Sequence, residues 1–158
     1  MKKKIISVCF AAMLMVGLTI TAEFPTNANE SKPMLDGSYL TCEDESTGIA
    51  GALTRGADLQ TGYSKLRELG PGKIYAGGTT IAQHDVESLK VSVIVERAKD
   101  ADDYWHYVDS WQKENKNTYT VSTSKMLEVE PDWYYRVRCI HSAGNDMSSS
   151  FTDGLYID

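Results

Sequence analysis

The sequence predicts an all-β protein, an antiparallel sandwich of about seven short strands. Apolar and polar residues alternate over several segments, which is the period of a half-buried strand. Turn signals recur every ~8 to 14 residues, a spacing typical of sandwiches. No long helical pattern competes with these strands. A small β-barrel is the alternative, because a strand pattern does not distinguish closure of one sheet from stacking of two.

The first predicted strand covers residues 73–84. It follows Gly70-Pro71-Gly72, a strong turn signal. Residues 89–96 form the clearest strand, because every second residue from Leu89 to Val95 is aliphatic. One face of this strand is therefore expected to lie in the core.

Polar turns precede the next two predicted strands, over residues 104–111 and 119–129. In the second, Thr123 and Lys125 interrupt the apolar face, which predicts a bend or bulge.

After Pro131, residues 133–140 alternate again. Trp133 and every second residue as far as Cys139 point one way, and the residues between them point the other. A turn at residues 143–146 leads into the last predicted strand, over 149–157.

Residues 133–144 resemble the F strand and F–G turn of fibronectin type III domains, in which an aromatic-rich strand enters an Ala-Gly turn. In this resemblance Trp133 takes the place of the corner tyrosine, and Cys139 and His141 take those of an alanine and an asparagine. The resemblance implies an immunoglobulin/fibronectin-like sandwich.

A wider resemblance covers most of residues 55 to 158. Its motifs are Gly78-Thr79-Thr80, the strand 89–96, Ser110-Trp111, the Tyr-Tyr-Arg-Val run, His141-Ser142-Ala143 and Thr152-Asp153-Gly154. Together they are similar to a family of small secreted proteins of unknown function from Gram-positive anaerobes. The resemblance implies export and a β domain, and no known activity.

Residues 1–22 have the layout of a secretory signal peptide. Lys2, Lys3 and Lys4 form a positive region, an apolar run follows, and Thr21-Ala22 offers small residues for cleavage, with Ala28 as the second choice. The apolar run is short for a membrane span. We therefore expect a secreted, extracellular product with no membrane partner after cleavage.

Residues 23–54 are expected to form a flexible acidic leader before a sandwich domain at 55–158. The segment has few large apolar residues, and a short helix is expected near residues 49–53. Without the three signal lysines the chain has 13 basic and 22 acidic residues, a net charge of −9. Such a chain repels phosphate backbones, so no nucleic-acid partner is expected, whereas neutral glycans, cations and basic protein surfaces remain candidates.

Cys42 and Cys139 are the only cysteines after the predicted signal peptide. In an exported protein they are candidates for a disulfide, which would attach the leader to the sandwich. Cys139 lies on the apolar face of its strand, where a free cysteine behaves as a small hydrophobic residue. The sequence leaves both states open.

Trp105, Tyr107 and Trp111 share one parity of the strand 104–111 and are the leading ligand-binding candidates. On a face exposed to solvent they would stack on sugar rings. On an inward face they would be core residues, which the more polar opposite parity favours.

A second, smaller candidate patch consists of Tyr134, Arg136 and Arg138. The period of their strand turns these residues away from the core, so we expect the arginines to stack on the tyrosine at the surface.

No residue is predicted to be catalytic, and no metal or cofactor is expected. His84, His106 and His141 lie on separate predicted strands without a zinc-binding spacing. His141 and Ser142 are adjacent, so their side chains face opposite sides of a sheet and cannot form a catalytic dyad.

These patterns predict a secreted, non-enzymatic module that binds a glycan or a protein. A secreted antimicrobial or toxin-like protein is the first alternative. A glycoside-active enzyme is the second, because a pair of catalytic carboxylates is not recognisable among 22 acidic residues.

Overall fold

The computed structural model describes residues 32–50 and 56–158. In chain order its strands are β1 (Met34–Leu35), β2 (Ser38–Thr41), β3 (Glu45–Ile49), β4 (Leu59–Gly70), β5 (Lys73–Val86), β6 (Leu89–Ala98), β7 (His106–Asn115), β8 (Thr118–Glu128), β9 (Trp133–Ala143), β10 (Asp146–Phe151) and β11 (Gly154–Ile157). Within these ranges no helix has the length and hydrophobicity of a membrane span. The predicted signal peptide, both cleavage sites and most of the expected helix near residue 50 lie outside the described residues.

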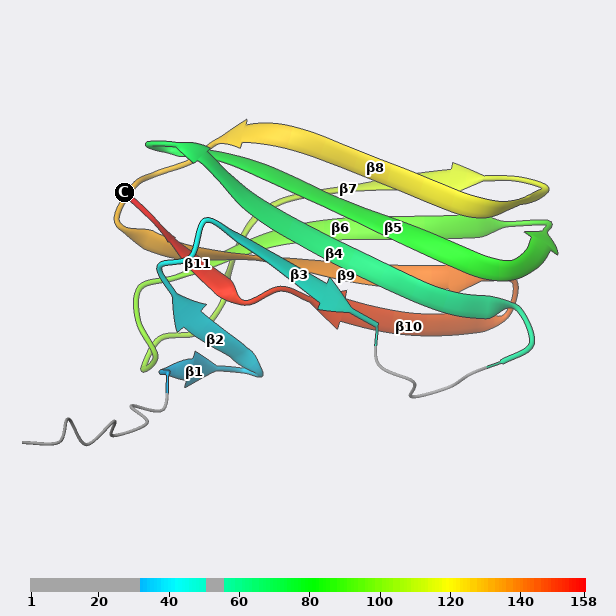
Figure 1. The fold of residues 1–158 in the computed structure, drawn as a ribbon, viewed down its shortest axis with the longest axis horizontal. Coiled ribbons are helices and arrows are strands. Elements are labelled where there is room, and N and C mark those ends of the chain that lie inside the picture. The colour runs from blue at the N-terminus through cyan, green and yellow to red at the C-terminus, as the bar shows by residue number, and fades with distance from the viewer. Residues whose placement is uncertain (1–31, 51–55) are drawn as a thin grey trace, which may run out of the picture. The chain divides into compact units, whose positions relative to one another are not determined.

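The strands form two sheets that stack face to face (Figure 1). One sheet has the order β1-β2-β11-β9-β6-β7, and β10 pairs with β9 along the same edge as β11. The other sheet has the order β3-β4-β5-β8. The pairing of β2 with β11 is parallel, and the other pairings are antiparallel. Each sheet ends in edge strands, so the fold is a sandwich and not a closed barrel.

The strand order is that of an immunoglobulin-like sandwich. β4, β5 and β8 occupy the places of strands A, B and E, and β7, β6 and β9 occupy those of C′, C and F. β10 and β11 together take the place of strand G. The sequence prediction of a sandwich is therefore confirmed, but residues 32–50 and 56–158 contain eleven strands instead of about seven. The predicted strand 149–157 is divided at Thr152-Asp153, and β1 to β4 were not predicted.

Tyr135 holds the corner where the chain passes from β8 to β9. Its hydroxyl donates a hydrogen bond of 2.8 Å to the backbone oxygen of Glu130, five residues earlier. This is the geometry of the tyrosine corner of immunoglobulin-like folds. The resemblance assigned that place to Trp133, whose indole instead lies 4.4 Å below the guanidinium of Arg97.

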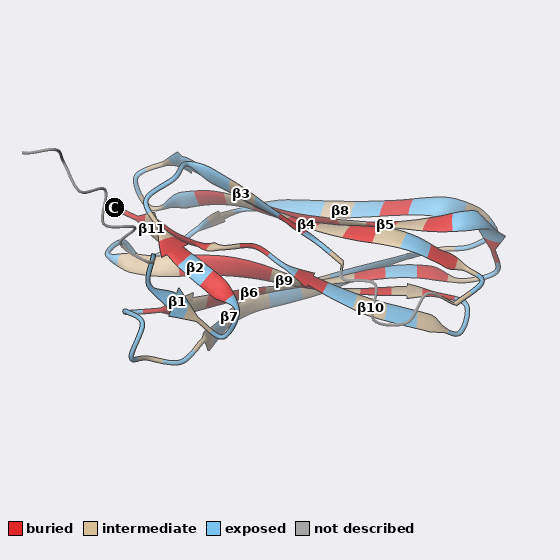
Figure 2. Cartoon of the chain, turned by 60° about the horizontal axis from the view of Figure 1, so that its bottom comes forward, coloured by how far each residue is buried: buried red, intermediate tan, exposed pale blue. Residues whose placement is uncertain are grey.

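The core lies between the two sheets, and buried residues alternate with exposed ones along the strands (Figure 2). The predicted aliphatic face of β6 is confirmed, because every second residue from Leu89 to Val95 is fully buried. From β9 the core receives Tyr135, Val137 and Cys139, as the period predicted. Each fully buried aliphatic or aromatic side chain contributes roughly 1.5–3 kcal/mol to folding.

Residues 34–49 belong to the sandwich, which corrects the prediction of a flexible leader over 23–54. β1 and β2 form a hairpin around Asp36-Gly37, whose φ angles of 46° and 79° suit a type I′ turn. β2 then pairs with β11, and β3 pairs with β4 along its whole length. The predicted domain boundary at residue 55 is therefore too late. The small residues Ser38 and Gly48 occupy buried positions of these short strands, so no apolar alternation revealed them.

Candidate functional site

The three aromatic residues predicted to share a face of 104–111 are separated in the structure. β7 begins at His106, so Trp105 lies before the strand. Between Tyr107 and Asp109 the register with β6 shifts by one residue, which is a bulge. A bulge reverses the side-chain parity. Tyr107 consequently faces solvent while Trp111 packs against the core, so the predicted aromatic stripe is wrong.

Trp111 lies beneath Lys125, which reaches it from β8. The Lys125 ammonium is 4.5 Å from the indole centroid and 3.1 Å from the Asp109 carboxylate. These contacts connect the edges of the two sheets. They also explain why Lys125, a charged residue, occupies an inward-facing position of β8. The pairing of β8 with β5 is unbroken from Thr120 to Glu128. The predicted bend at this place is therefore absent from β8.

Arg136 lies on the outer face of β9, as predicted, but it is only 3% exposed. Its guanidinium donates hydrogen bonds to the carboxylate of Glu96 (2.9 Å) and to both the carboxylate and the backbone oxygen of Asp36 (3.0 Å each). Because Asp36 belongs to the β1–β2 turn, the hairpin covers Arg136. The prediction of an exposed arginine is corrected at this position.

Trp105 completes this cluster. Its ring lies 4.4 Å from the Arg136 guanidinium, and its indole N–H donates to the backbone oxygen of Leu35 over 3.1 Å. Arg138 donates to the second oxygen of Glu96 over 3.0 Å. The predicted stacking of arginine on Tyr134 is replaced by stacking on Trp105.

A cavity of about 360 Å³ lies at this cluster, lined by Leu35, Asp36, Glu96, Tyr104, Trp105, Arg136 and Arg138. Arg136 is already bonded to two carboxylates, so its charge is compensated within the protein. The cluster brings together three of the six predicted binding residues, and its contacts attach the β1–β2 hairpin to the sheet. We interpret the cluster mainly as a set of contacts that stabilises the fold. A ligand would contact it through Tyr104 and Arg138.

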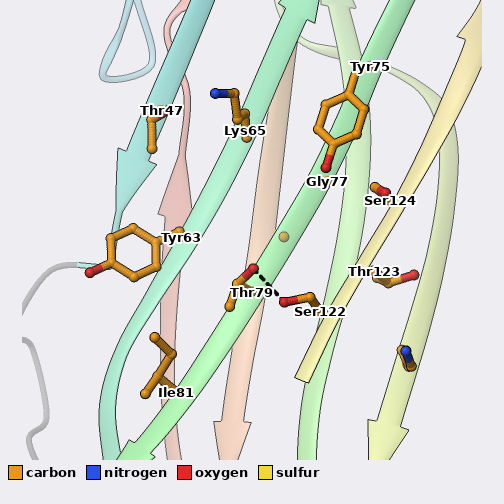
Figure 3. A pocket seen from close by; sticks show the side chains of 12 residues that line it. Thr47, Tyr63, Lys65, Tyr75, Gly77, Thr79, Ile81, Ser122, Thr123 and Ser124 are labelled. Atoms are coloured by element: carbon orange, nitrogen blue, oxygen red, sulfur yellow. Dashed lines mark hydrogen bonds between the residues drawn. The ribbon is translucent and has the colours of Figure 1, made fainter. Parts of the chain in front are cut away.

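A larger groove, of about 670 Å³, lies over the outer face of the sheet β3-β4-β5-β8 (Figure 3). Its floor is at Gly77, which is paired with Lys65 of β4 on one side and with Ser124 of β8 on the other. Because glycine has no side chain, the sheet is hollow between these neighbours. A Cβ atom at this position would lie 3.1 Å from the Tyr75 hydroxyl and 3.0 Å from the Ser124 Cβ.

Two tyrosines stand on either side of this floor. Tyr63 belongs to β4 and Tyr75 to β5, and Figure 3 shows their rings flanking Gly77 and Thr79. Both are only partly buried. Aromatic side chains are favoured in strands, and the period of two turns both rings outward. The arrangement gives two apolar ring faces within one groove.

Hydroxyl groups and ammonium groups supply the polar part of the lining. Thr79 and Ser122 form a cross-strand pair whose hydroxyl oxygens are 2.8 Å apart. The remaining polar side chains that line the groove are Thr47, Lys65, Lys113, Thr123 and Ser124. Among the described residues, the lining includes no aspartate or glutamate. The groove therefore combines aromatic faces, hydroxyl hydrogen bonding and positive charge.

This groove was not predicted from the sequence, because β4 was not recognised as a strand. Its outward positions Thr61, Tyr63 and Lys65 alternate with inward Gly62 and Ser64, which carry almost no hydrophobic signal. Gly62 is required by packing, since a Cβ there would lie 2.3 Å from the ring of His141. The alternation of tyrosine and lysine with small residues is the signal that was available.

His141 is fully buried between the two sheets. Thr80 donates its hydroxyl proton to the backbone oxygen of Lys90, so its oxygen accepts from His141 Nδ1 over 2.8 Å. His141 Nε2 in turn accepts from the Ser150 hydroxyl over 2.8 Å. Burial lowers the pKa of His141 to about 4, so the ring is neutral at pH 7.

The two other histidines are more exposed and form separate pairs. His84 lies 3.2 Å from Asp58, and His106 lies 3.1 Å from Asp103. Across residues 32–50 and 56–158, no group of three His, Cys, Asp or Glu side chains is placed to hold a metal ion.

Cys42 and Cys139 are not bonded to each other in the structure. Cys42 is exposed in the segment after β2, whereas Cys139 is buried in β9. The Cys139 thiol donates to the backbone oxygen of Gly77 over 3.7 Å, and burial raises its pKa to about 12. Of the two states that the sequence left open, the structure contains the free thiols.

No protein-family model matches the chain, and no curated protein matches it either.

Proposed function

We propose that this chain is an exported, non-enzymatic binding module that holds a glycan in the groove over β3-β4-β5-β8. The observation that carries the proposal is the pair of tyrosine rings, Tyr63 and Tyr75, on either side of a hollow floored by Gly77. Sugar rings have apolar faces that stack on aromatic side chains, and their hydroxyl groups exchange hydrogen bonds with polar side chains. Thr79 and Ser122 present such hydroxyls between the two rings.

The chemistry of the lining favours binding over hydrolysis. Glycoside hydrolysis uses two carboxylates that flank the scissile bond. The described residues that line the groove contribute hydroxyls, ammonium groups and rings, but no carboxylate. Export is supported by the signal-peptide pattern of residues 1–22.

Affinity electrophoresis and isothermal titration calorimetry against a panel of plant, bacterial and animal polysaccharides test this proposal. We expect saturable binding of at least one polysaccharide. We expect the double variant Tyr63→Ala, Tyr75→Ala to lose it while keeping the melting temperature within a few degrees, because both rings are on the surface.

Tyr107→Ala is the matched control, since Tyr107 is an exposed tyrosine on the other sheet. This variant is expected to bind as the unchanged protein does. The proposal is wrong if no polysaccharide of the panel binds. It is also wrong if Tyr107→Ala abolishes binding and the groove variant does not.

A further inference from the structure

We propose that the groove selects an acidic polysaccharide, one that carries carboxylates along its chain. This inference rests on the proposed function, because it names the class of glycan held by the same groove. It starts from the charge of the lining, which includes Lys65 and Lys113 and, among the described residues, no acidic side chain. The whole chain has a net charge of −6, which predicts repulsion of polyanions at long range, but the charged groups that line this groove are cationic and act at contact distance.

The two lysines lie on opposite sides of the groove. Lys65 belongs to β4 and is paired with Thr47 of β3. Lys113 belongs to β7, on the same side of that strand as Trp111, and reaches the groove beyond the edge strand β8. Two strand spacings, each about 4.8 Å, separate β4 from β8. The two lysines thus come from strands on either side of β5 and β8, an arrangement that suits an extended polymer with repeated acidic groups better than a small anion.

Neither lysine is committed to a strong partner within the protein. Lys65 lies 3.3 Å from Glu45, but both side chains are about half exposed, and exposed ion pairs contribute little. Lys113 forms no ion pair within 4 Å of any acidic side chain in the described part of the chain. A ligand carboxylate can therefore bind these groups without breaking a buried ion pair.

Hydroxyl donors between the lysines complete the fit to a carboxylated sugar. One of the Thr79 and Ser122 hydroxyls donates a hydrogen bond to the other over 2.8 Å, so the proton of the accepting hydroxyl is free for a ligand oxygen. The tyrosine rings then contact the apolar faces of the sugars, while the carboxylates point toward the lysines. The recognised ligand is an extended uronic-acid polymer.

The test uses pairs of polysaccharides that differ only in the charge of their carboxyl groups. Polygalacturonate is compared with its fully methyl-esterified form, and hyaluronate with its carboxyl-reduced form. We expect the unchanged protein to bind the acidic member of at least one pair about tenfold more tightly at low ionic strength. The preference is expected to fall as sodium chloride is raised, because the ammonium groups are exposed.

The double variant Lys65→Met, Lys113→Met keeps two unbranched side chains and removes both charges. We expect it to bind the acidic and neutral members of a pair equally, with the neutral affinity unchanged. Lys90→Met is the charge control, because Lys90 pairs with Glu114 on the other sheet. This control is expected to keep the tenfold preference.

The outcomes separate the two proposals. Equal binding of both members by the unchanged protein overturns the acidic preference and leaves glycan binding standing. The acidic preference of the groove is likewise overturned if the Lys65→Met, Lys113→Met protein still favours the acidic member tenfold. Absence of binding to every polysaccharide, acidic or neutral, overturns both proposals.

Discussion

Arg136 donates a hydrogen bond from Nε to the Glu96 carboxylate over 2.9 Å, and both side chains are at least nine-tenths buried although they lie on the outer face of their sheet. The β1–β2 hairpin, through Asp36 and Leu35, covers the pair together with Trp105. Loss of a partner from a buried charge is costly, and Arg138 bonds only the other oxygen of the Glu96 carboxylate, so it does not replace the bond from Arg136.

Replacing Arg136 by methionine is therefore expected to lower the free energy of unfolding by about 3–5 kcal/mol. Urea denaturation monitored by circular dichroism measures this loss. Arg138→Met is the control, since Arg138 binds the same carboxylate but is more exposed, and it is expected to cost about 1 kcal/mol or less. Equal losses of unfolding free energy for the two variants would show that the hairpin does not bury the Arg136–Glu96 ion pair.

Stability is expected to fall as the pH is lowered from 6.5 to 4. The pKa of His141 is about 4 in the folded protein and 6.5 for an ordinary histidine, so the unfolded chain binds a proton over this interval that the folded chain does not. Each pH unit then costs about 1.4 kcal/mol, or roughly 3 kcal/mol over the whole interval. Above pH 6.5 this contribution is constant.

Urea unfolding of the unchanged protein and of His141→Gln, at several pH values, checks the prediction. Glutamine does not titrate, so the difference in unfolding free energy between the two proteins should narrow as the pH falls. Acidic residues contribute equally to both proteins and cancel in the difference. A difference that stays constant from pH 7 to 4 would contradict a neutral, buried His141.

Alanine substitutions at two adjacent glycines of β5 are expected to affect different properties, stability at one position and glycan binding at the other. At Gly78, a Cβ would lie 2.6 Å from the Cys139 sulfur and 2.9 Å from a methyl carbon of Val91, so Gly78→Ala should cost roughly 1–3 kcal/mol of stability. At Gly77 the new methyl group faces the groove, so Gly77→Ala should mainly weaken glycan binding. Thermal melts and calorimetric titrations of both variants distinguish the effects. If Gly77→Ala lowers stability and Gly78→Ala weakens binding instead, Gly78 does not face the core and Gly77 does not face the groove.

The two cysteines should react with thiol reagents at very different rates. Cys42 is exposed, whereas Cys139 is buried and its pKa is about 12, so almost no thiolate forms there at pH 8. Brief treatment with iodoacetamide, followed by peptide mass spectrometry, should label Cys42 in the native protein and both residues in 8 M urea. Recovery of a peptide pair joined through Cys42 and Cys139 under non-reducing conditions would contradict the free thiols.

Strands with a one-sided apolar pattern were predictable from local sequence. The aliphatic positions of β6 and the alternating aromatic residues of β9 face the core because a sheet buries one side of each strand. Hairpin β1–β2 was not predicted, although Asp36-Gly37 is a favoured two-residue turn, because its strands are too short to show a period. β4 escaped because its inward positions include Gly62 and Ser64, which pack closely against neighbours without being hydrophobic.

The candidate site depended on contacts between distant segments. A single-residue bulge in β7 separated Tyr107 from Trp111, and the pairing of β7 with β6 defines that bulge. Arg136 was expected at the surface because strand parity places it outside, but a hairpin about 100 residues earlier covers it. Tyr63 and Tyr75 share a groove because β4 and β5 pair in a register that leaves Gly77 between Lys65 and Ser124.

The sequence by itself determined an all-β fold and which faces of β6 and β9 are apolar, because the period of a strand is a local property of the chain. Only the tertiary structure decided which outward residues meet solvent and which lie beneath another strand. It also decided where a hollow forms on the sheet, since that depends on the register of three strands and on one glycine among them. Burial and shape arise from pairings between residues far apart in the chain, and a local pattern carries no information about them.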